Sequence, residues 1–218
     1  MIEIVFSGYG GQGVLTAGLL IAQMAVFKGY CATWIPQYGS AMRGGTANCT
    51  VKFGREAIHN PSQEAPDILL AMNAPSLQRF LPMVKPGGTV ILNIDFVDPA
   101  LVNRDDVKLL AIPCVSMAKE IGHKLGANII MAGAICYVSG EFSEQDAIDG
   151  MNDMFRKKGK EKFEEINTKA LKLGFNYEKE AKAVSAAAAL AASASAASAA
   201  SAASTQASAQ ASASAQSA

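Results

Sequence analysis

The chain has 218 residues, of which 50% are hydrophobic, and this is enough for one domain with a sizeable core. Its formal net charge is zero and its pI is about 6.7, so the charge balance gives no support to a general nucleic-acid-binding surface. Residues 183–218 are almost only Ala and Ser and carry no charge. They lack both the large side chains of a core and the apolarity of a membrane span. We expect residues 1–182 to form the domain and residues 183–218 to be a low-complexity tail outside the fold.

Strands and helices are predicted to alternate from the start of the chain. Residues 2–7 form an apolar run typical of a buried strand, and 13–27 are a long apolar run rich in helix formers. The sequence "CATWI" (31–35) predicts a second strand that Pro36 ends. A glycine-rich loop follows, and the alternating "TANCTVKF" (46–53) predicts a third strand.

The rest of the domain continues this alternation. Apolar runs at 67–72, 87–94 and 107–112 predict strands, and short helices are expected at 74–84 and 116–124. Three longer helices close the domain: Asn128 is expected to cap the first, Ser143 with Asp146 the second, and Gly174 to end the third, which begins at 161. The predicted fold is a three-layer α/β/α domain with a mostly parallel sheet, a Rossmann-like first βα turn, and the last helices packed outside it.

The first strand-to-helix loop is glycine-rich. Gly8, Gly10 and Gly13 fit the dinucleotide fingerprint G-x-G-x-x-G, which brings a pyrophosphate onto a helix N-terminus. A dinucleotide site also needs an acidic residue about 20 positions further on, for the ribose hydroxyls. No acidic residue lies between Glu3 and Glu56, a window that holds four cations: Lys28, Arg43, Lys52 and Arg55. The loop therefore suits either another anion, such as a phosphate or carboxylate, or a purely structural tight turn.

A second loop, "QYGSAMRGG", follows the second predicted strand. In an α/β sheet it lies at the same edge as the first loop, which places Tyr38 and Arg43 near "GYGGQG". Arg43 precedes Gly44 and Gly45, so its guanidinium stands beside a backbone without side chains. This pattern suits anion clamping or a subunit interface, and a solvated surface arginine is the alternative.

The remaining reactive residues predict no catalytic or metal site. The four cysteines, at 31, 49, 114 and 136, form no C-x-x-C motif, which favours buried, reduced thiols and a cytoplasmic protein. The two histidines, His59 and His123, have no neighbours that suggest a triad or a metal site.

Taken together, the motifs "GYGGQGVLTAG", "YGSAMRGGTANCTV", "IHNP" and "PDILLAMN" resemble the gamma subunit of 2-oxoacid:ferredoxin oxidoreductases over residues 2–182. The resemblance implies oxidative decarboxylation of a 2-oxoacid with coenzyme A, giving an acyl-CoA, CO₂ and reduced ferredoxin. It implies thiamine diphosphate, Mg²⁺ and [4Fe-4S] clusters in other subunits, namely alpha, beta and a ferredoxin-like delta, and ferredoxin as the electron acceptor. The 2-oxoglutarate and 2-oxoisovalerate branches are favoured. No nucleic acid and no membrane span are expected.

The resemblance also suggests what the two loops do. They would pack against the thiamine-bearing subunits and help to receive coenzyme A, with no catalytic residue and no metal ligand in this chain. The expected binding residues are Gly8, Gly10, Gly11, Gln12, Gly13, Tyr38, Arg43, Gly44 and Gly45. Two alternatives stay open: an assembly subunit without a ligand, and a nicotinamide-dependent dehydrogenase.

Overall fold

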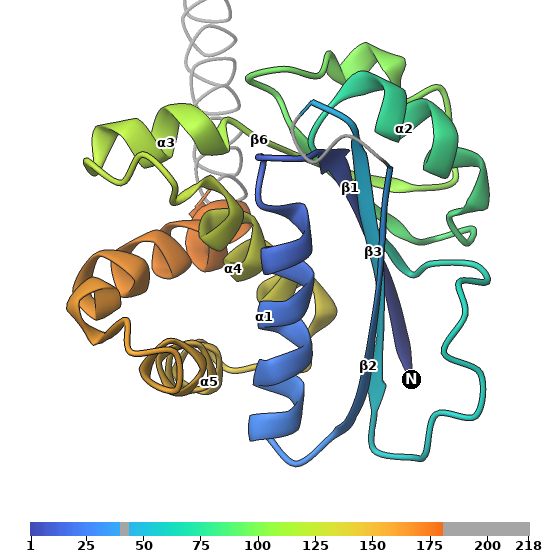
Figure 1. Cartoon of the computed structure of the whole chain (residues 1–218). Coiled ribbons are helices and arrows are strands. Elements are labelled where there is room, and N and C mark those ends of the chain that lie inside the picture. Colours follow the sequence, from blue (N-terminus) through green and yellow to red (C-terminus); the bar gives the residue numbers. More distant parts are fainter. Residues whose placement is uncertain (40–43, 181–218) are drawn as a thin grey trace, which may run out of the picture. The chain divides into compact units, whose positions relative to one another are not determined.

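A computed structural model describes residues 1–39 and 44–180 of the chain. Contacts divide the chain into two units, Met1–Glu178 and Lys179–Ala218, and all the elements below lie in the first unit. A six-stranded sheet runs through this unit in the order β2-β3-β1-β4-β5-β6 (Figure 1). The strands are β1 (Ile2–Tyr9), β2 (Cys31–Tyr38), β3 (Thr46–Gly54), β4 (Ile68–Ala71), β5 (Thr89–Asn93) and β6 (Lys108–Ile112).

The sheet is mostly parallel, as predicted. Strands β1, β4, β5 and β6 pair in parallel, whereas β3 is antiparallel to both of its neighbours, β1 and β2. Strand β3 is thus the one strand of this sheet that runs in the opposite direction. The connection between β2 and β3 is too short for the helical crossover that a parallel pair needs, so the two strands form an antiparallel hairpin. As a consequence, β1 and β2 both end at the same edge of the sheet.

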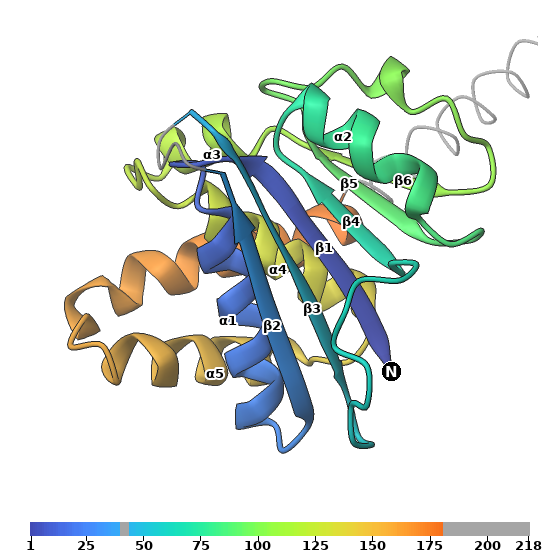
Figure 2. The same ribbon diagram turned by 45° about the vertical axis from the view of Figure 1, so that its right-hand side comes forward.

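Helices cover both faces of the sheet (Figures 1 and 2), which confirms the α/β class. The short helix α2 (Ala74–Phe80) lies on one face. The other face carries the remaining helices and the larger core. These are α1 (Val14–Phe27), α3 (Cys114–Glu120), α4 (Ala127–Ser139), α5 (Glu144–Arg156) and the helical residues 164–178.

The two cores follow from the alternation of side chains along the strands. On β1, Ile4 and Phe6 face α1 and the larger core, whereas Val5 faces α2 and the smaller one. Helix α1 is apolar on nearly all sides because it is packed between β3 on one side and α4 and α5 on the other. Helix α5 packs against α1 and α4 and has no strand among its main contacts, and its buried side chains join the larger core.

Three local predictions were wrong, each for a physical reason. Strand β2 continues through Pro36 to Tyr38. It is an edge strand, where a proline is tolerated because its missing N–H is not needed for pairing on the open side of the sheet. Helix α4 starts at Ala127, with Gly126 at its N-cap, so Asn128 lies inside it. Gly174 is in the interior of the last helix instead of ending it. By contrast, the capping box of Ser143 and Asp146 at the start of α5 is confirmed.

Candidate functional site

The two glycine-rich loops meet at one edge of the sheet, as the sequence predicts. The Gly10 N–H donates to the carbonyl oxygen of Gly45 at 2.8 Å, and the Gly44 N–H donates to the carbonyl oxygen of Gly10 at 3.2 Å. These reciprocal bonds join the loop after β1 to the loop after β2 through main-chain atoms alone. Arg43 belongs to residues 40–43, which lie outside the described residues.

Two glycines of the first loop are required by the backbone. Gly11 and Gly13 have φ values of 103° and 77°, in the left-handed region that side chains disfavour. A Cβ at Gly13 would also lie 2.8 Å from the Asn128 side chain. Gly13 of the fingerprint and the neighbouring Gly11 are therefore needed where the chain turns sharply from β1 into α1.

Gln12 holds this turn in place. Its Oε1 accepts a hydrogen bond from the Tyr9 N–H at 2.7 Å, and its Nε2 donates to the Met72 carbonyl oxygen at 3.2 Å. Asn73, which caps α2, also approaches Oε1, at 3.4 Å. The side chain of Gln12, one of the expected binding residues, thus ties the end of β1 to the end of β4.

The start of α1 offers unused hydrogen-bond donors. Its N-cap, Gly13, provides no side-chain cap, and the N–H groups of Val14, Leu15 and Thr16 have no acceptor among the described residues. These residues line a hollow of about 760 Å³ that extends to Tyr38, whose side chain is 69% exposed. Unpaired N–H groups and the helix dipole favour an anion at this end of a helix.

The cations of the acid-free window do not gather here. Lys28 pairs with Asp146 at 2.6 Å at the far end of α1, and Arg55 lies over the Tyr30 ring. Lys52 is buried near the start of β1, where it bonds Glu64 at 2.6 Å and lies 3.4 Å from Glu3. These three cations of the acid-free window therefore lie away from the glycine loop; Lys52 does so because β1 and β3 run antiparallel, which carries it to the opposite edge of the sheet.

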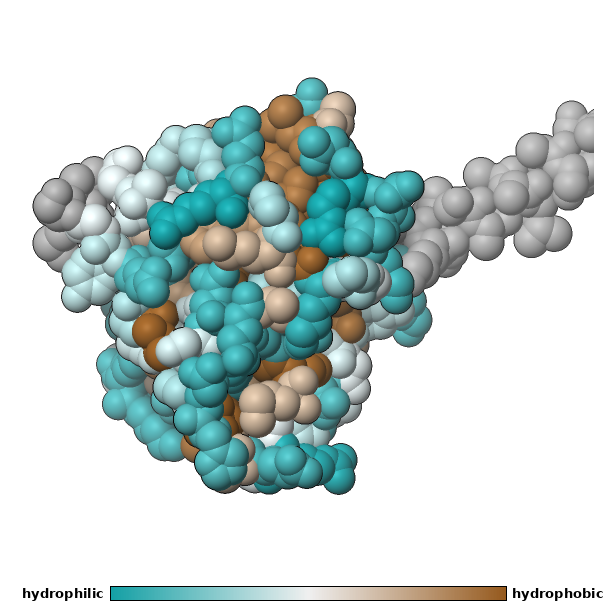
Figure 3. Space-filling model, turned by 90° about the vertical axis from the view of Figure 1, so that its right-hand side faces the viewer, coloured by the Kyte–Doolittle hydropathy of each residue, from teal (hydrophilic) through white to brown (hydrophobic). Residues whose placement is uncertain are grey.

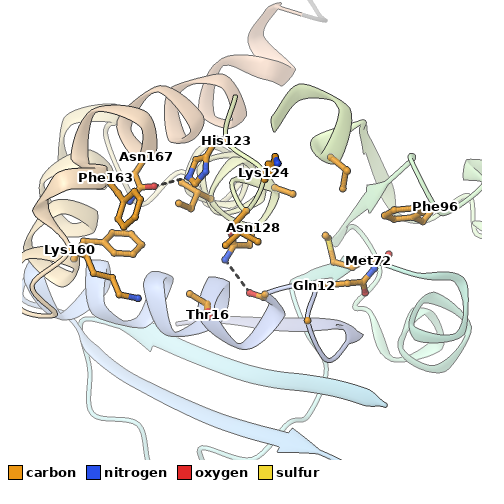
Figure 4. Close-up of a pocket in the computed structure, with 17 residues that line it drawn as sticks. Gln12, Thr16, Met72, Phe96, His123, Lys124, Asn128, Lys160, Phe163 and Asn167 are labelled. Atoms are coloured by element: carbon orange, nitrogen blue, oxygen red, sulfur yellow. Dashed lines mark hydrogen bonds between the residues drawn. The ribbon is translucent and has the colours of Figure 1, made fainter. Parts of the chain in front are cut away.

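A second cavity, of about 490 Å³, opens on the other side of α1's first turn (Figure 4). Gly11, Gly13 and Thr16 line both cavities. Figure 4 shows Lys160 and Phe163 on one side of the cavity, and Met72 and Phe96 on the other. His123 and Lys124 come from the connection between α3 and α4. This cavity joins residues far apart in the sequence.

Two amides support the wall of this cavity. Asn128 Nδ2 points to the Gly13 carbonyl oxygen at 3.5 Å, and Asn167 Oδ1 lies 2.8 Å from His123 Nε2 (Figure 4). Sequence reasoning used Asn128 only as a helix cap and missed the cavity. The motif "PDILLAMN" offered one usable signal for the cavity. It predicts the strand β4, which is parallel to β1 and therefore ends at the same edge of the sheet, with Met72 in the cavity lining. Nothing in the sequence places Lys160 or Asn167 there.

The fold and its loops define a three-layer α/β protein whose first βα turn leaves main-chain N–H groups unpaired at the start of α1. Within residues 1–39 and 44–180, no group of three or more His, Cys, Asp or Glu side chains could hold a metal ion. Within the same residues, no helix is long and apolar enough to cross a bilayer.

The chain belongs to the pyruvate ferredoxin/flavodoxin oxidoreductase family, whose model matches residues 3–177. This agrees with the resemblance drawn from the loop motifs. It also makes the chain a member of a family of oxidoreductases.

Named relatives fall within the 2-oxoacid oxidoreductases. The 2-oxoglutarate synthase subunit KorC of Methanothermobacter thermautotrophicus is 32% identical over 157 residues, which cover 69% of this chain and 83% of KorC. The ketoisovalerate oxidoreductase subunit VorA of Methanothermobacter marburgensis is 34% identical over 180 residues, which cover 81% of this chain. The match spans only 36% of VorA, so the chain corresponds to about a third of that relative's length.

A solved structure shares the fold. The gamma subunit of a keto/oxoacid ferredoxin oxidoreductase from Geobacter sulfurreducens has a TM-score of 0.64 at 28% identity. The likeness covers 81% of this chain and 97% of that chain. The fold therefore matches that of a gamma subunit over nearly its whole length.

Proposed function

We propose that the chain is the gamma subunit of a thiamine-diphosphate-dependent 2-oxoacid:ferredoxin oxidoreductase. The complete reaction converts a 2-oxoacid, coenzyme A and oxidised ferredoxin to an acyl-CoA, CO₂ and reduced ferredoxin. In this proposal, thiamine diphosphate, Mg²⁺ and [4Fe-4S] clusters belong to alpha, beta and delta subunits. The four free cysteines fit a reducing cytoplasm, and the relatives named above favour 2-oxoglutarate or 2-oxoisovalerate as substrate.

We propose further that this chain completes the coenzyme A side of the active site. The observation that carries this is the hollow between the two joined loops, into which the unpaired N–H groups of α1 open. A phosphate of coenzyme A would accept from these N–H groups, and the exposed ring of Tyr38 would contact the organic part of the molecule. Arg43 remains a proposed anion clamp. The residues of this chain thus bind and orient coenzyme A and carry out no bond-making step.

The test uses the whole complex, co-expressed and purified with its thiamine-bearing subunits. We expect CoA-dependent reduction of a viologen dye with one or more members of a 2-oxoacid panel. Tyr38→Ala should raise the KM for coenzyme A about three- to ten-fold and leave the KM for the oxoacid unchanged, and Arg43→Ala should act in the same direction. The matched control is Phe27→Ala, since Phe27 is also an exposed aromatic residue, at 51%, but lies at the other end of α1. Unchanged constants in both loop variants would refute the coenzyme A proposal.

One observation favours the alternative of an assembly subunit without a ligand. Gln12 is engaged by main-chain groups, and three of the four cations in the acid-free window lie elsewhere. In that case Tyr38→Ala would weaken subunit association in size-exclusion chromatography without changing any Michaelis constant. A nicotinamide dehydrogenase has less support, because no carboxylate is among the described residues that line the hollow. Saturable binding of NADH to the isolated chain would revive it.

A further inference from the structure

We propose that the second cavity is a binding site for a small aryl carboxylate, that is, an organic anion with a flat apolar body. We call it the Lys124–Lys160 cavity. It lies between the first turn of α1, the connection that precedes α4, and residues 160–167 (Figure 4). This proposal does not depend on whether coenzyme A binds in the hollow beside Tyr38.

The charges around the cavity select an anion. None of its 17 lining residues is acidic, whereas Lys124 and Lys160 both line it. Neither lysine forms an ion pair with any described residue. The nearby carboxylate of Glu164 is already bound by Arg156 and Asn152. The two ammonium groups are therefore left to attract a carboxylate from outside the chain.

The apolar wall selects a flat ring. Four large apolar side chains line the cavity, namely Phe96, Leu125, Phe155 and Phe163, and Figure 4 shows Phe163 and Phe96 on opposite sides of it. Leu125 is 80% exposed, Phe96 60% and Phe163 42%, although each comes from a different part of the chain. Large apolar side chains that gather at one opening mark a place where a ligand or partner covers them. Aromatic rings stack well on one another, so a planar body fits this wall.

The size and shape of the cavity favour a small molecule. Its volume of about 490 Å³ falls in the range typical of small-ligand sites. Gly13 and Asn128 stand at its wall, where they are joined by the contact between Asn128 Nδ2 and the Gly13 carbonyl. The apolar surface on the α2 side of the molecule, by contrast, is interrupted by hydrophilic residues (Figure 3). The hollow beside Tyr38 has no lysine or arginine among its described lining residues, and the cavity beside Arg55 is also lined by Glu56 and Glu141.

The test is a calorimetric titration of the full chain with phenylacetate as the probe. Two further probes separate the two parts of the site: phenylacetamide has the same shape without the charge, and butyrate has the charge without the ring. We expect saturable binding of phenylacetate and at least about ten-fold weaker binding of the other two. Equal affinity for phenylacetamide, or no saturation up to about 10 mM phenylacetate, would overturn the proposal.

Variants locate the site. The double variant Lys124→Gln, Lys160→Gln should weaken phenylacetate binding about five-fold or more, and Phe163→Ala should do the same. Lys119→Gln, Lys158→Gln is the matched control, because these lysines are also exposed or partly exposed but do not line the cavity. Melting curves that match that of the parent would show that the test variants are folded. Unchanged phenylacetate binding in both variants would then overturn the proposal. Tyr38→Ala should leave phenylacetate binding intact, so this proposal and the coenzyme A proposal fail independently.

Discussion

Gly174 lies so close to the carbonyl oxygen of Ile130 that a Cβ at position 174 would overlap it. Gly133 of α4 makes the reverse approach, since its Cβ would overlap the carbonyl oxygen of Leu171. Helix α4 and the helical residues 164–178 therefore cross at nearly backbone-to-backbone distance. This crossing brings Asn167 within hydrogen-bond distance of His123 in the wall of the Lys124–Lys160 cavity.

Gly174→Ala should destabilise the protein. Helix propensity alone predicts a gain of about 1 kcal/mol for replacing a helical glycine by alanine. The new methyl group meets backbone atoms, which cannot rotate away, and overpacking of this kind costs about 1–3 kcal/mol. We expect a lower free energy of unfolding in urea, whereas Lys169→Ala, at an exposed position of the same helix, should change it by less than about 0.5 kcal/mol. A stabilised Gly174→Ala variant would contradict the close crossing.

Lys52→Met should be among the most damaging single substitutions. Lys52 is 2% exposed and lies 3.4 Å from Glu3, which is itself buried. Removing the ammonium group leaves a buried carboxylate without its cation, which costs about 3–5 kcal/mol. The control is Lys85→Met, because the ion pair of Lys85 with Asp67 is partly exposed and pairs of that kind contribute about 0–1 kcal/mol. Equal losses in the two variants, measured by urea unfolding, would argue against the buried pair.

Gln12 substitutions should separate its two hydrogen bonds. Gln12→Ala leaves the Tyr9 N–H and the Met72 carbonyl unpaired and should cost about 1–3 kcal/mol. Gln12→Glu keeps the acceptor for Tyr9 but places a carboxylate against the Met72 oxygen, which raises the pKa of that carboxyl group in the folded state. Part of the loss should therefore be recovered as the pH falls through this raised folded pKa toward the unfolded value of about 4.3, where the recovery is complete. Gln37→Ala, on the exposed end of β2, should be neutral. A pH-independent defect in Gln12→Glu would show that the side chain does not face Met72.

The stability of the protein should fall on acidification. The hydrogen bond from Lys52 lowers the pKa of Glu64, and the hydrogen bond from Lys28 lowers the pKa of Asp146. A carboxyl group whose folded pKa is lowered stabilises the fold above its unfolded pKa of about 4, and this contribution is lost as the pH falls through the folded pKa. Urea midpoints measured from neutral pH downward should therefore decline below about pH 4.5. Glu64→Gln should flatten that decline, and an identical pH profile in the variant would exclude Glu64 as a source of it.

The four thiols should differ sharply in reactivity. Cys31 is exposed, whereas burial raises the pKa of Cys49 and of Cys114 to about 12 and also raises that of Cys136. A thiol-specific dye at mild alkaline pH should label one cysteine quickly and the other three only after unfolding. Rapid labelling in Cys31→Ser would show that a second thiol is accessible.

Much of the fold was predictable because its strands are apolar and clearly bounded. The runs at 67–72 and 87–94 became β4 and β5 with small shifts at their ends. Reading Gly174 as a helix end failed because a glycine in sequence looks the same whether it ends a helix or permits a close crossing. The direction of β3 could not be read from its alternating pattern.

The candidate site was only half predictable. The meeting of the two loops followed from the rule that strands running the same way end at one edge, and the structure brings Gly10 and Gly45 together. The acid-free window did not indicate where its cations lie, because Lys28 and Lys52 pair with carboxylates outside that window. The Lys124–Lys160 cavity depends on how the last helices pack, which no short motif records.

The reciprocal bonds between Gly10 and residues 44–45 have a consequence for how this surface can change over evolutionary time. Because only peptide groups take part, replacing side chains elsewhere in either loop leaves the link itself untouched. The loops are thus free to diversify toward new partners while their mutual spacing is preserved. Chemical synthesis could test this link by replacing the amide N–H of Gly10 with an ester oxygen. This change would remove the donor to the Gly45 carbonyl oxygen and weaken the link between the two loops without altering a side chain.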